Sequence, residues 1–305
     1  MEINQDLYHA ISNIPNKKRH QYFRLTDRLG KGASGSVYLV DTDLTYIPLV
    51  AKKPHTRHTS NEVSAHLFIR DKMLSEELPH YFPMLYANYT HNCKKYLIME
   101  LCDESVFDDY FVEEQRSTLE FLEIFYQIAD AVDALEQIEM NHGDLWTDNV
   151  MIWYTGSKPK VCIIDFDCTF KKGVCENPAL GYGNDYRKDF FIGYDLSRLF
   201  DDIKHSYDNY KLKRTVCKNK YTKRILKQQQ KGQCLEIDPY ASDSETKEYD
   251  EVNIKFTPDI IEFIYSLELS DPSEPTQAPH MSGASIKQRI IEFAKKKNIE
   301  CTSFL

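Results

Sequence analysis

The chain has 305 residues, of which 42% are hydrophobic and 28% are charged, and its formal net charge is −9. This composition is typical of a globular protein with one large domain or two lobes. The acidic balance argues against a general or sequence-specific nucleic-acid binder, which would be basic. No apolar run approaches the roughly 20 residues that span a bilayer, and the first residues contain no apolar signal core. We therefore expect a cytoplasmic protein without a membrane span, whose eight scattered cysteines are free thiols.

The first third of the chain alternates between strand and helix signals. Residues 22–53 combine short apolar runs with turn residues, which predicts a hairpin-rich sheet. Residues 60–77 carry apolar positions at helical spacing, with Ser60 as the expected N-cap. The run KYLIMEL at 95–101 is typical of a buried strand. These elements predict a small lobe built on a sheet.

The rest of the chain is mostly helical. Residues 117–140 show the strongest helical periodicity, and a loop with two short strands follows them. A second helix is expected from about residue 193. Two more are expected near 258–269 and 284–297, at the end of the sequence. The changeover predicts an α+β, bilobal fold with a cleft between the lobes.

We accordingly expect an N-terminal extension at 1–21, a sheet lobe at 22–102 and a helical lobe at 103–305. The helical lobe contains a charged insertion at about 208–252. Its first part, 211–231, holds nine Lys or Arg and no acid, and its second part, 236–251, is acidic. The basic part is either a docking surface for an acidic partner or a solvated segment that neutralises the acidic one.

The first candidate site is the glycine-rich segment GKGASGSV at 30–37. Glycines let backbone N–H groups approach phosphate oxygens without a Cβ in the way. A helix directly after the segment would indicate a dinucleotide site, but the strand-like run SVYLV follows. We therefore expect a glycine-rich lid between two antiparallel strands, with a plain turn as the alternative.

Two adjacent lysines, Lys52 and Lys53, end the apolar run LVAKK. A buried ammonium group needs a polar partner, and phosphate oxygens would serve. Strand alternation places Lys52 and Val50 on one face and Lys53 on the other, which favours Lys52 without excluding Lys53 or a solvated lysine. Glu62 on the following helix is the expected partner of the buried lysine.

Two loops carry candidate catalytic and metal-binding carboxylates. In HGDLWTDN at 142–149, Asp144 can orient a substrate hydroxyl and accept its proton, and Asn149 can reach a metal. Asp165 ends the apolar strand that precedes FD, and Mg²⁺ prefers one or two such carboxylates plus phosphate oxygens. A turn or helix-cap role is the alternative for each of these residues.

GKGASGSV, VAKK, HGDLWTDN and DFD stand in the order and at the separations of the eukaryotic-type protein kinase signature set, which the chain resembles over roughly residues 22–200. YLIMELCDE lies between them, where that fold has its hinge. The resemblance implies ATP and Mg²⁺ as cofactors, a protein substrate and a monomeric enzyme. Asp144 would be the catalytic base, Lys52 would bind the α- and β-phosphates, and Asn149 and Asp165 would hold Mg²⁺.

The resemblance also assigns the nucleotide site. The glycines would cover the phosphates, Val37 and Val50 would pack on the adenine, Met99 would be the gatekeeper, and Glu100 to Cys102 would form the hinge. The implied nucleotide-binding residues are Leu29, Gly30, Lys31, Gly32, Ala33, Ser34, Gly35, Ser36, Val37, Val50, Lys52, Glu62, Met99, Glu100 and Cys102. Asp195 resembles the helix aspartate that braces the catalytic loop.

The chain departs from the kinase pattern at three positions of its two loops. Gly143 replaces the arginine that meets a phosphorylated activation loop, so such control is expected to be absent. Trp146 stands where serine/threonine kinases carry a lysine, so that cation is missing or comes from elsewhere. Asp167 replaces the glycine of DFG, which makes a swing of this loop harder. The stretch 176–192 also contains no APE motif.

These departures leave three functions open. Kinases of large DNA viruses share the arginine-free loop and DFD, and haspin-type kinases also lack APE, which favours a divergent protein serine/threonine kinase. HGDLW with a following asparagine resembles fructosamine kinases and aminoglycoside phosphotransferases, which act on small-molecule hydroxyls. The third possibility is a pseudokinase scaffold, although every group that phosphoryl transfer needs is present.

Overall fold

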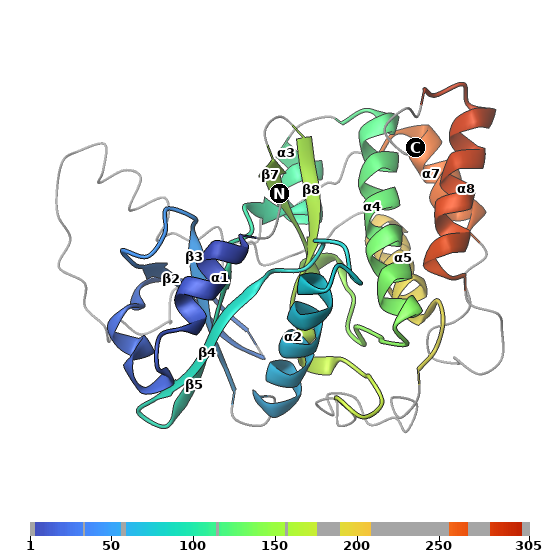
Figure 1. Ribbon diagram of the computed structural model, residues 1–305. Helices are drawn as coiled ribbons and strands as arrows, with labels where there is room; N and C mark the ends of the chain where they lie inside the picture. The colour runs from blue at the N-terminus through green and yellow to red at the C-terminus, as the bar shows by residue number, and fades with distance from the viewer. Residues whose placement is uncertain are drawn as a thin grey trace, which may run out of the picture.

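The computed structural model describes residues 4–32, 34–55, 59–113, 116–155, 158–175, 190–208, 256–267 and 281–300. Strands dominate the first part of the chain and helices the last part, which confirms the expected α+β class. Figure 1 shows strands β2 to β5 with helices α1 and α2 at one end of the molecule, and helices α4, α5, α7 and α8 at the other. Of the charged insertion expected at about 208–252, the structure describes only residue 208. Both charge blocks therefore lie outside the described residues.

The N-terminal sheet has five antiparallel strands in the order β1-β2-β3-β5-β4. The strands are β1 (Arg24–Lys31), β2 (Gly35–Asp41), β3 (Leu49–Pro54), β4 (Leu85–His91) and β5 (Lys94–Glu100). Strand β3 is central, and almost all of its residues are buried. The hairpin β1–β2 carries the glycine-rich segment at its turn, as the sequence predicts.

Three helical segments accompany this sheet. They are α1 (Gln5–Ser12), the short 3₁₀ helix η1 (Asn16–Gln21) and α2 (Thr59–Leu74). Asn4 caps α1 by accepting a hydrogen bond from Leu7 N at 2.8 Å. The prediction that Ser60 caps α2 is wrong, because α2 begins at Thr59 and Ser60 lies within its first turn. Neither α1 nor β4 was predicted, because both are short and they depend on tertiary contacts, among them the packing of α1 on β4.

A second, three-stranded sheet follows the hinge segment, in the order β6-β7-β8. Its strands are β6 (Glu104–Ser105), β7 (Val150–Thr155) and β8 (Lys158–Ile163). The short helical segments around it are η2 (Val106–Tyr110), α3 (Phe111–Glu113), η3 (Thr147–Asn149) and η4 (Phe166–Cys168). Since η3 precedes β7 and η4 follows β8, the candidate catalytic loop (142–149) and the second acidic loop (165–169) lie at the same end of this hairpin.

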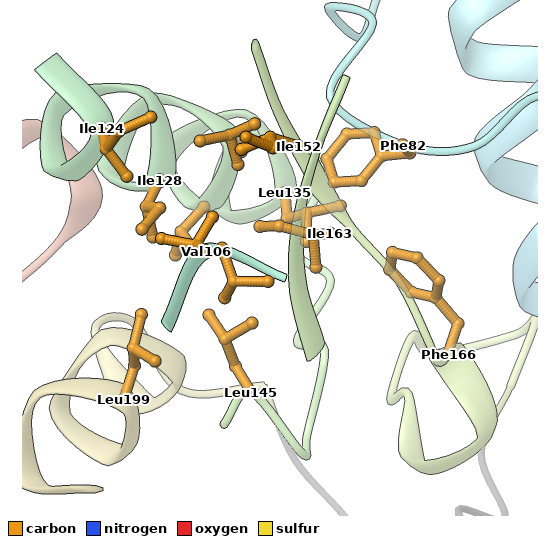
Figure 2. Packing of buried hydrophobic residues seen from close by; sticks show 14 of the residues in the cluster. Phe82, Val106, Ile124, Ile128, Leu135, Leu145, Ile152, Ile163, Phe166 and Leu199 are labelled. Atoms are coloured by element: carbon orange, nitrogen blue, oxygen red, sulfur yellow. The ribbon is translucent and has the colours of Figure 1, made fainter. Parts of the chain in front are cut away.

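Four longer helices complete the described chain: α4 (Thr118–Gln137), α5 (Tyr194–Asp208), α7 (Pro258–Ser266) and α8 (Gly283–Lys296). Helix α4 starts with a capping box, in which Ser117 and Glu120 satisfy each other's backbone N–H groups. Its apolar face packs on the second sheet. Figure 2 shows Ile124, Ile128 and Leu135 of α4 turned toward Ile152 and Ile163 of the β7–β8 hairpin.

The core continues from this contact toward both acidic loops. Leu145 of the catalytic loop and Leu199 of α5 lie at one end of the cluster, and Phe166 lies at the other, near Phe82 (Figure 2). All four side chains are buried. The two loops are therefore held by apolar anchors that point away from their polar residues. Within the described segments, no helix has the length and hydropathy needed to cross a bilayer.

Candidate active site

Lys52 joins the sheet, helix α2 and the second acidic loop. Its Nζ lies 2.5 Å from Oε1 of Glu62 and 2.7 Å from Oδ1 of Asp165. The register pairs Val37 with Lys52 and Ser36 with Lys53, so the two lysines leave opposite faces of β3. Lys52 is buried and Lys53 is half-buried. Of the two candidate lysines, Lys52 is the one that the fold brings to the acidic residues.

Lys52 and Asp165 stabilise each other's charge, whereas burial raises the pKa of Glu62 to about 7 against the opposing effect of Lys52. Burial by itself lowers the pKa of Lys52, but the negative charges of Glu62 and Asp165 outweigh it, and the pKa is raised. Burial also works against ionisation of Asp165, yet the charge of Lys52 and hydrogen bonds from Lys52 and Ser34 hold its pKa below the usual value. Both groups are therefore charged near neutral pH, as a phosphate-binding lysine and a metal-binding carboxylate must be.

The glycine-rich turn lies over this pair. Ser34 donates a hydrogen bond from Oγ to Oδ2 of Asp165 at 2.8 Å, so the turn reaches the second acidic loop. Gly35 approaches β3 closely, because a Cβ at this position would lie 2.6 Å from the carbonyl oxygen of Lys53. At Gly30 and Gly32 a Cβ would meet no atom within 4 Å. Open space thus remains at these two glycines, while Ala33 lies outside the described residues.

An apolar cluster lies beneath the turn, on the same side of the sheet as Lys52. It consists of Val50, Val63, Leu85, Leu97 and Met99, with Val37, Leu67 and Leu101 packed against it. Val37, Val50 and Met99, which were assigned to the adenine site, therefore come together. Leu29 and Lys31 are exposed on β1 and Ser36 is buried on β2, so these three flank the turn without joining the cluster.

Two residues of the expected hinge, Glu100 and Cys102, use their side chains for contacts inside the protein. The buried carboxylate of Glu100 accepts hydrogen bonds from Met84 N at 3.0 Å and Tyr86 Oη at 3.2 Å, and it lies 2.9 Å from Nε2 of His80. The Cys102 thiol lies 2.9 Å from the Sγ of Cys162 in β8. Any nucleotide contact at Glu100 would therefore use its main chain, since its side chain is engaged inside the protein.

Asp195 of α5 holds the start of the catalytic loop. Its carboxylate accepts hydrogen bonds from the backbone N–H groups of His142 and Gly143, both at 2.8 Å. The imidazole of His142 in turn lies 2.8 Å from the carbonyl oxygen of Ile164 and packs on the ring of Phe166. The two acidic loops are thus fastened to each other and to α5.

Gly143 has a conformation that other residues rarely adopt. Its φ is +80°, and a Cβ at this position would lie 2.2 Å from the carbonyl oxygen of Cys168. A side chain at position 143, such as the arginine of the kinase pattern, would therefore require the backbone of the second acidic loop to move.

Asp144 lies on the loop between α4 and η3, with its side chain partly exposed. Its Oδ1 accepts hydrogen bonds from Nε1 of Trp146 at 2.6 Å and Nη2 of Arg198 at 2.8 Å. The side-chain amide nitrogen of Asn149 donates a hydrogen bond to the carbonyl oxygen of Asp144 at 2.8 Å. This bond orients the amide group and does not involve its oxygen. Asp144 and Asn149 are therefore mutually positioned by the loop itself.

Three contacting residues were not found from the sequence. Arg198 and Asp202 of α5 reach the catalytic loop, where Asp202 accepts from the backbone N and Oγ1 of Thr147 at 3.1 and 2.8 Å. Asn61 of α2 donates to the carbonyl oxygens of Asp167 and Thr169. Arg198 and Asp202 follow Asp195 by three and seven positions, which is the spacing of one helix face and was the signal available.

Two groups of residues near these loops could hold a metal. Asp165, kept ionised by Lys52, and the amide oxygen of Asn149 have the ligand chemistry that Mg²⁺ prefers. Asp144, Asp167 and Cys168 form a separate group whose ligand atoms lie within 4.8 Å of one another. A thiol is a poor ligand for Mg²⁺, so the first pair fits this ion better.

Comparison with known proteins agrees with this arrangement. The family model for protein tyrosine and serine/threonine kinases matches residues 23–173. A curated relative, the serine/threonine-protein kinase PknD of Chlamydia abortus, is 24% identical over 177 residues. That alignment covers 52% of this chain and 18% of the relative, so the chain spans less than a fifth of that protein's length.

The matched segment runs from the start of the sheet to the end of the second acidic loop and contains the candidate site except for the residues that α5 contributes. A fold and a site of this kind are typical of the protein kinase class. The chain belongs to the eukaryotic-type protein kinase superfamily, with its kinase signature in residues 23–173. Its resemblance to viral and haspin-type kinases stays a prediction.

Proposed function

We propose that this protein is an ATP- and Mg²⁺-dependent kinase that transfers the γ-phosphoryl group to serine and threonine hydroxyls of proteins. The observation that carries the proposal is the buried chain of ion pairs from Glu62 through Lys52 to Asp165. Buried charged groups such as Lys52 and Asp165 are costly unless they have a task, and phosphate and metal binding supplies one. The specificity for serine and threonine is supported by the motif pattern and by the name of the relative.

In this proposal each group has one role. Lys52 binds phosphate oxygens of ATP, and Asp165 with Asn149 holds Mg²⁺, which would neutralise charge on the phosphates. The apolar cluster around Val50 and Met99 receives the adenine. Asp144 orients the acceptor hydroxyl and takes its proton. Catalysis then consists of alignment and electrostatic stabilisation, because the protein forms no covalent bond with the phosphoryl group.

The proposal extends to the organisation of the protein. A sheet lobe at 22–102 would carry the nucleotide and a helical lobe at 103–305 the acceptor. The enzyme would act as a monomer on proteins of the cytoplasm, as composition and cysteine usage suggest. Gly143 supports an enzyme that does not depend on a phosphorylated activation loop, because the position has no room for an arginine side chain.

The decisive experiment offers labelled ATP and Mg²⁺ to the purified protein with two kinds of acceptor. One is a mixed protein lysate whose own kinases have been inactivated, and the other is a panel of sugar amines. We expect label on serine and threonine of proteins, and none with Asp144→Asn. Label on the sugar amines alone would indicate a small-molecule kinase, and no transfer to either would indicate a pseudokinase.

A further inference from the structure

Helix α5 presents one polar face to the catalytic loop. Asp195, Arg198 and Asp202 recur at positions that share a face of the helix, and each contacts a different part of the loop. Asp195 and Asp202 bind backbone N–H groups and fix the course of the chain. Arg198 differs from them, because it ends on the side chain of the proposed base.

The guanidinium group of Arg198 is held in place on three sides. Its Nη2 lies 2.8 Å from Oδ1 of Asp144, and its Nη1 lies 3.2 Å from Oη of Tyr194. Its Cζ lies 4.0 Å from the centre of the Trp146 ring, a distance at which a cation is attracted by the π face. The indole therefore serves as a platform for the guanidinium, and it donates to the same carboxylate oxygen.

The burial of Arg198 strengthens its electrostatic interaction with Asp144. Only 11% of its side chain is exposed, compared with 30% for Asp144, so water screens the pair less than it would at the surface. Its Nε is buried and has no hydrogen-bond partner among the residues that the structure describes. An arginine kept only to tie α5 to the loop would be expected to use this donor. Nη1 also lies 3.5 Å from the carbonyl oxygen of Gly143, but the side-chain acceptor that Arg198 meets in the loop is the carboxylate of Asp144.

Both donors to Asp144 use Oδ1, and no bond to Oδ2 occurs within the described part of the chain. This leaves one carboxylate oxygen to accept the proton of an acceptor hydroxyl. It also places a fixed positive charge beside the point where the anionic carboxylate and the transferring phosphoryl group would approach each other. A lysine in the loop cannot do this here, because position 146 is a tryptophan.

We propose that Arg198 is the positioning cation of the acceptor side, supplied from α5 instead of from the catalytic loop, with Trp146 as its platform. This inference rests on the proposed function, since it takes Asp144 as the base. Arg198 acts through Asp144: it selects the carboxylate orientation that leaves Oδ2 toward the acceptor, and it offsets the negative charge that gathers there.

The test compares steady-state kinetics of Arg198→Met, Arg198→Gln and Arg198→Lys with wild type, using Mg²⁺-ATP and a degenerate peptide library with one serine or threonine per peptide. We expect kcat of the Met and Gln variants to fall by about 10²–10³-fold. The Lys variant should keep kcat within about tenfold of wild type, since it retains the charge. The KM for ATP should stay within about threefold in all three.

Two further variants separate this inference from the proposed function. Arg289→Met, on the exposed face of α8, controls for the loss of an arginine. The double variant Asp144→Asn with Arg198→Met should be no slower than Asp144→Asn alone. Asp144 and Arg198 act as one functional pair, so a second change in the pair costs nothing more. If Asp144→Asn is inactive while Arg198→Met keeps kcat within threefold of wild type, the inference is wrong and the proposed function stands.

A purely structural role makes different predictions for the same variants. The Gln and Lys variants would then behave alike, and the KM for ATP would rise together with a lower thermal midpoint. That outcome would overturn the inference. Should Arg198→Met fold poorly, the Gln and Lys variants decide the matter, because both keep a polar hydrogen-bond donor on an unbranched side chain and only Lys keeps the charge. Near-wild-type turnover of Asp144→Asn would refute both the base assignment and the role of Arg198.

Discussion

At the scale of single residues, the lysine that faces the cleft is selected by strand geometry. Lys52 and Lys53 are chemically equal neighbours on β3, and only their opposite directions distinguish them. The regular pairing of β2 with β3 from Gly35 to Val40 contains no bulge that would exchange them. Lys52 therefore meets Glu62 and Asp165, while Lys53 points to the other face.

We predict that Lys52→Met lowers the rate of phosphoryl transfer by orders of magnitude, because it removes the positive charge that contacts both Glu62 and Asp165. Lys53→Met, on the opposite face, should cost little and is the matched control. The measurement is single-turnover transfer from labelled ATP for both variants and wild type. If Lys53→Met were the inactive variant, the assignment of the phosphate-binding lysine would have to be exchanged.

The burial of His66 keeps its imidazole neutral and lowers the stability of the protein at acidic pH. It lies on α2, one turn after Glu62, and it packs edge-on against Phe166 with both ring nitrogens lacking hydrogen-bond partners in the described chain. Burial, together with the nearby positive charge of Lys52, lowers its pKa to about 3. The folded state thus holds a neutral imidazole where the unfolded chain, with a pKa near 6.5, would bind a proton.

We predict that His66→Leu makes the protein less sensitive to acid. Between about pH 6.5 and 3 the unfolded wild type binds the extra proton, so its stability falls as pH falls, by up to about 1.4 kcal/mol per pH unit. Urea unfolding at pH 7.5 and 5.5 should show the variant gaining stability relative to wild type at the lower pH. His9→Leu, at an exposed position of α1, is the control, and an equal slope for His66→Leu and wild type would contradict the argument.

At the scale of elements, local signals determine where a helix starts. Ser117 accepts from Glu120 N at 3.2 Å, and Glu120 accepts from Ser117 N at 2.8 Å. Both bonds join residues three apart, so they need no tertiary contact to form. This is why the strongest predicted helix, 117–140, begins within one residue of the observed α4.

We predict that Ser117→Ala lowers the free energy of unfolding by about 1 kcal/mol, because it removes the cap of a 20-residue helix. Ser60→Ala should cause no loss, since Ser60 lies inside α2, where alanine is the better helix former. Urea unfolding monitored by circular dichroism measures both. Equal destabilisation by the two changes would mean that the cap contributes nothing specific.

At the scale of the whole molecule, the site couples parts that are distant in sequence. Asp165 contacts Ser34 of the glycine-rich turn and Lys52 of the sheet, and Phe166 beside it packs on His142. A ligand that binds this junction contacts both ends of the molecule. Its binding energy should therefore appear as global stability.

We predict that ATP with Mg²⁺ raises the thermal midpoint of the wild type and of Asp144→Asn, but raises that of Asp165→Ala little or not at all. A ligand at one hundred times its Kd adds about 2.7 kcal/mol to stability. The reason for the difference is that Asp165 would hold the metal, whereas Asp144 faces the acceptor. If ATP with Mg²⁺ raised the thermal midpoint of Asp165→Ala as much as that of the wild type, the assignment of Asp165 as a metal ligand would be wrong.

Much of the fold was available from the sequence because it depends on local patterns. Helical periodicity predicted α2, α4, α5, α7 and α8, and alternation with turn residues predicted the glycine-bearing hairpin. The candidate residues Lys52, Asp144, Asn149 and Asp165 were also available, because glycine loops and loop carboxylates recur at fixed separations in the kinase signature. Their catalytic roles stay predictions until the variants are measured.

The tertiary structure decided what lies beside these residues. Short elements such as α1 and β4 exist because of the surfaces they cover. Neither Gly143 nor Trp146 could be understood from its own segment: the first is confined by the carbonyl of Cys168, and the second lies against Arg198. The sequence alone determines local conformation and the inventory of reactive groups. The partners of these groups come from segments distant in sequence, which meet only when the core forms. For this reason only the folded structure shows that the cation beside Asp144 is Arg198 of α5.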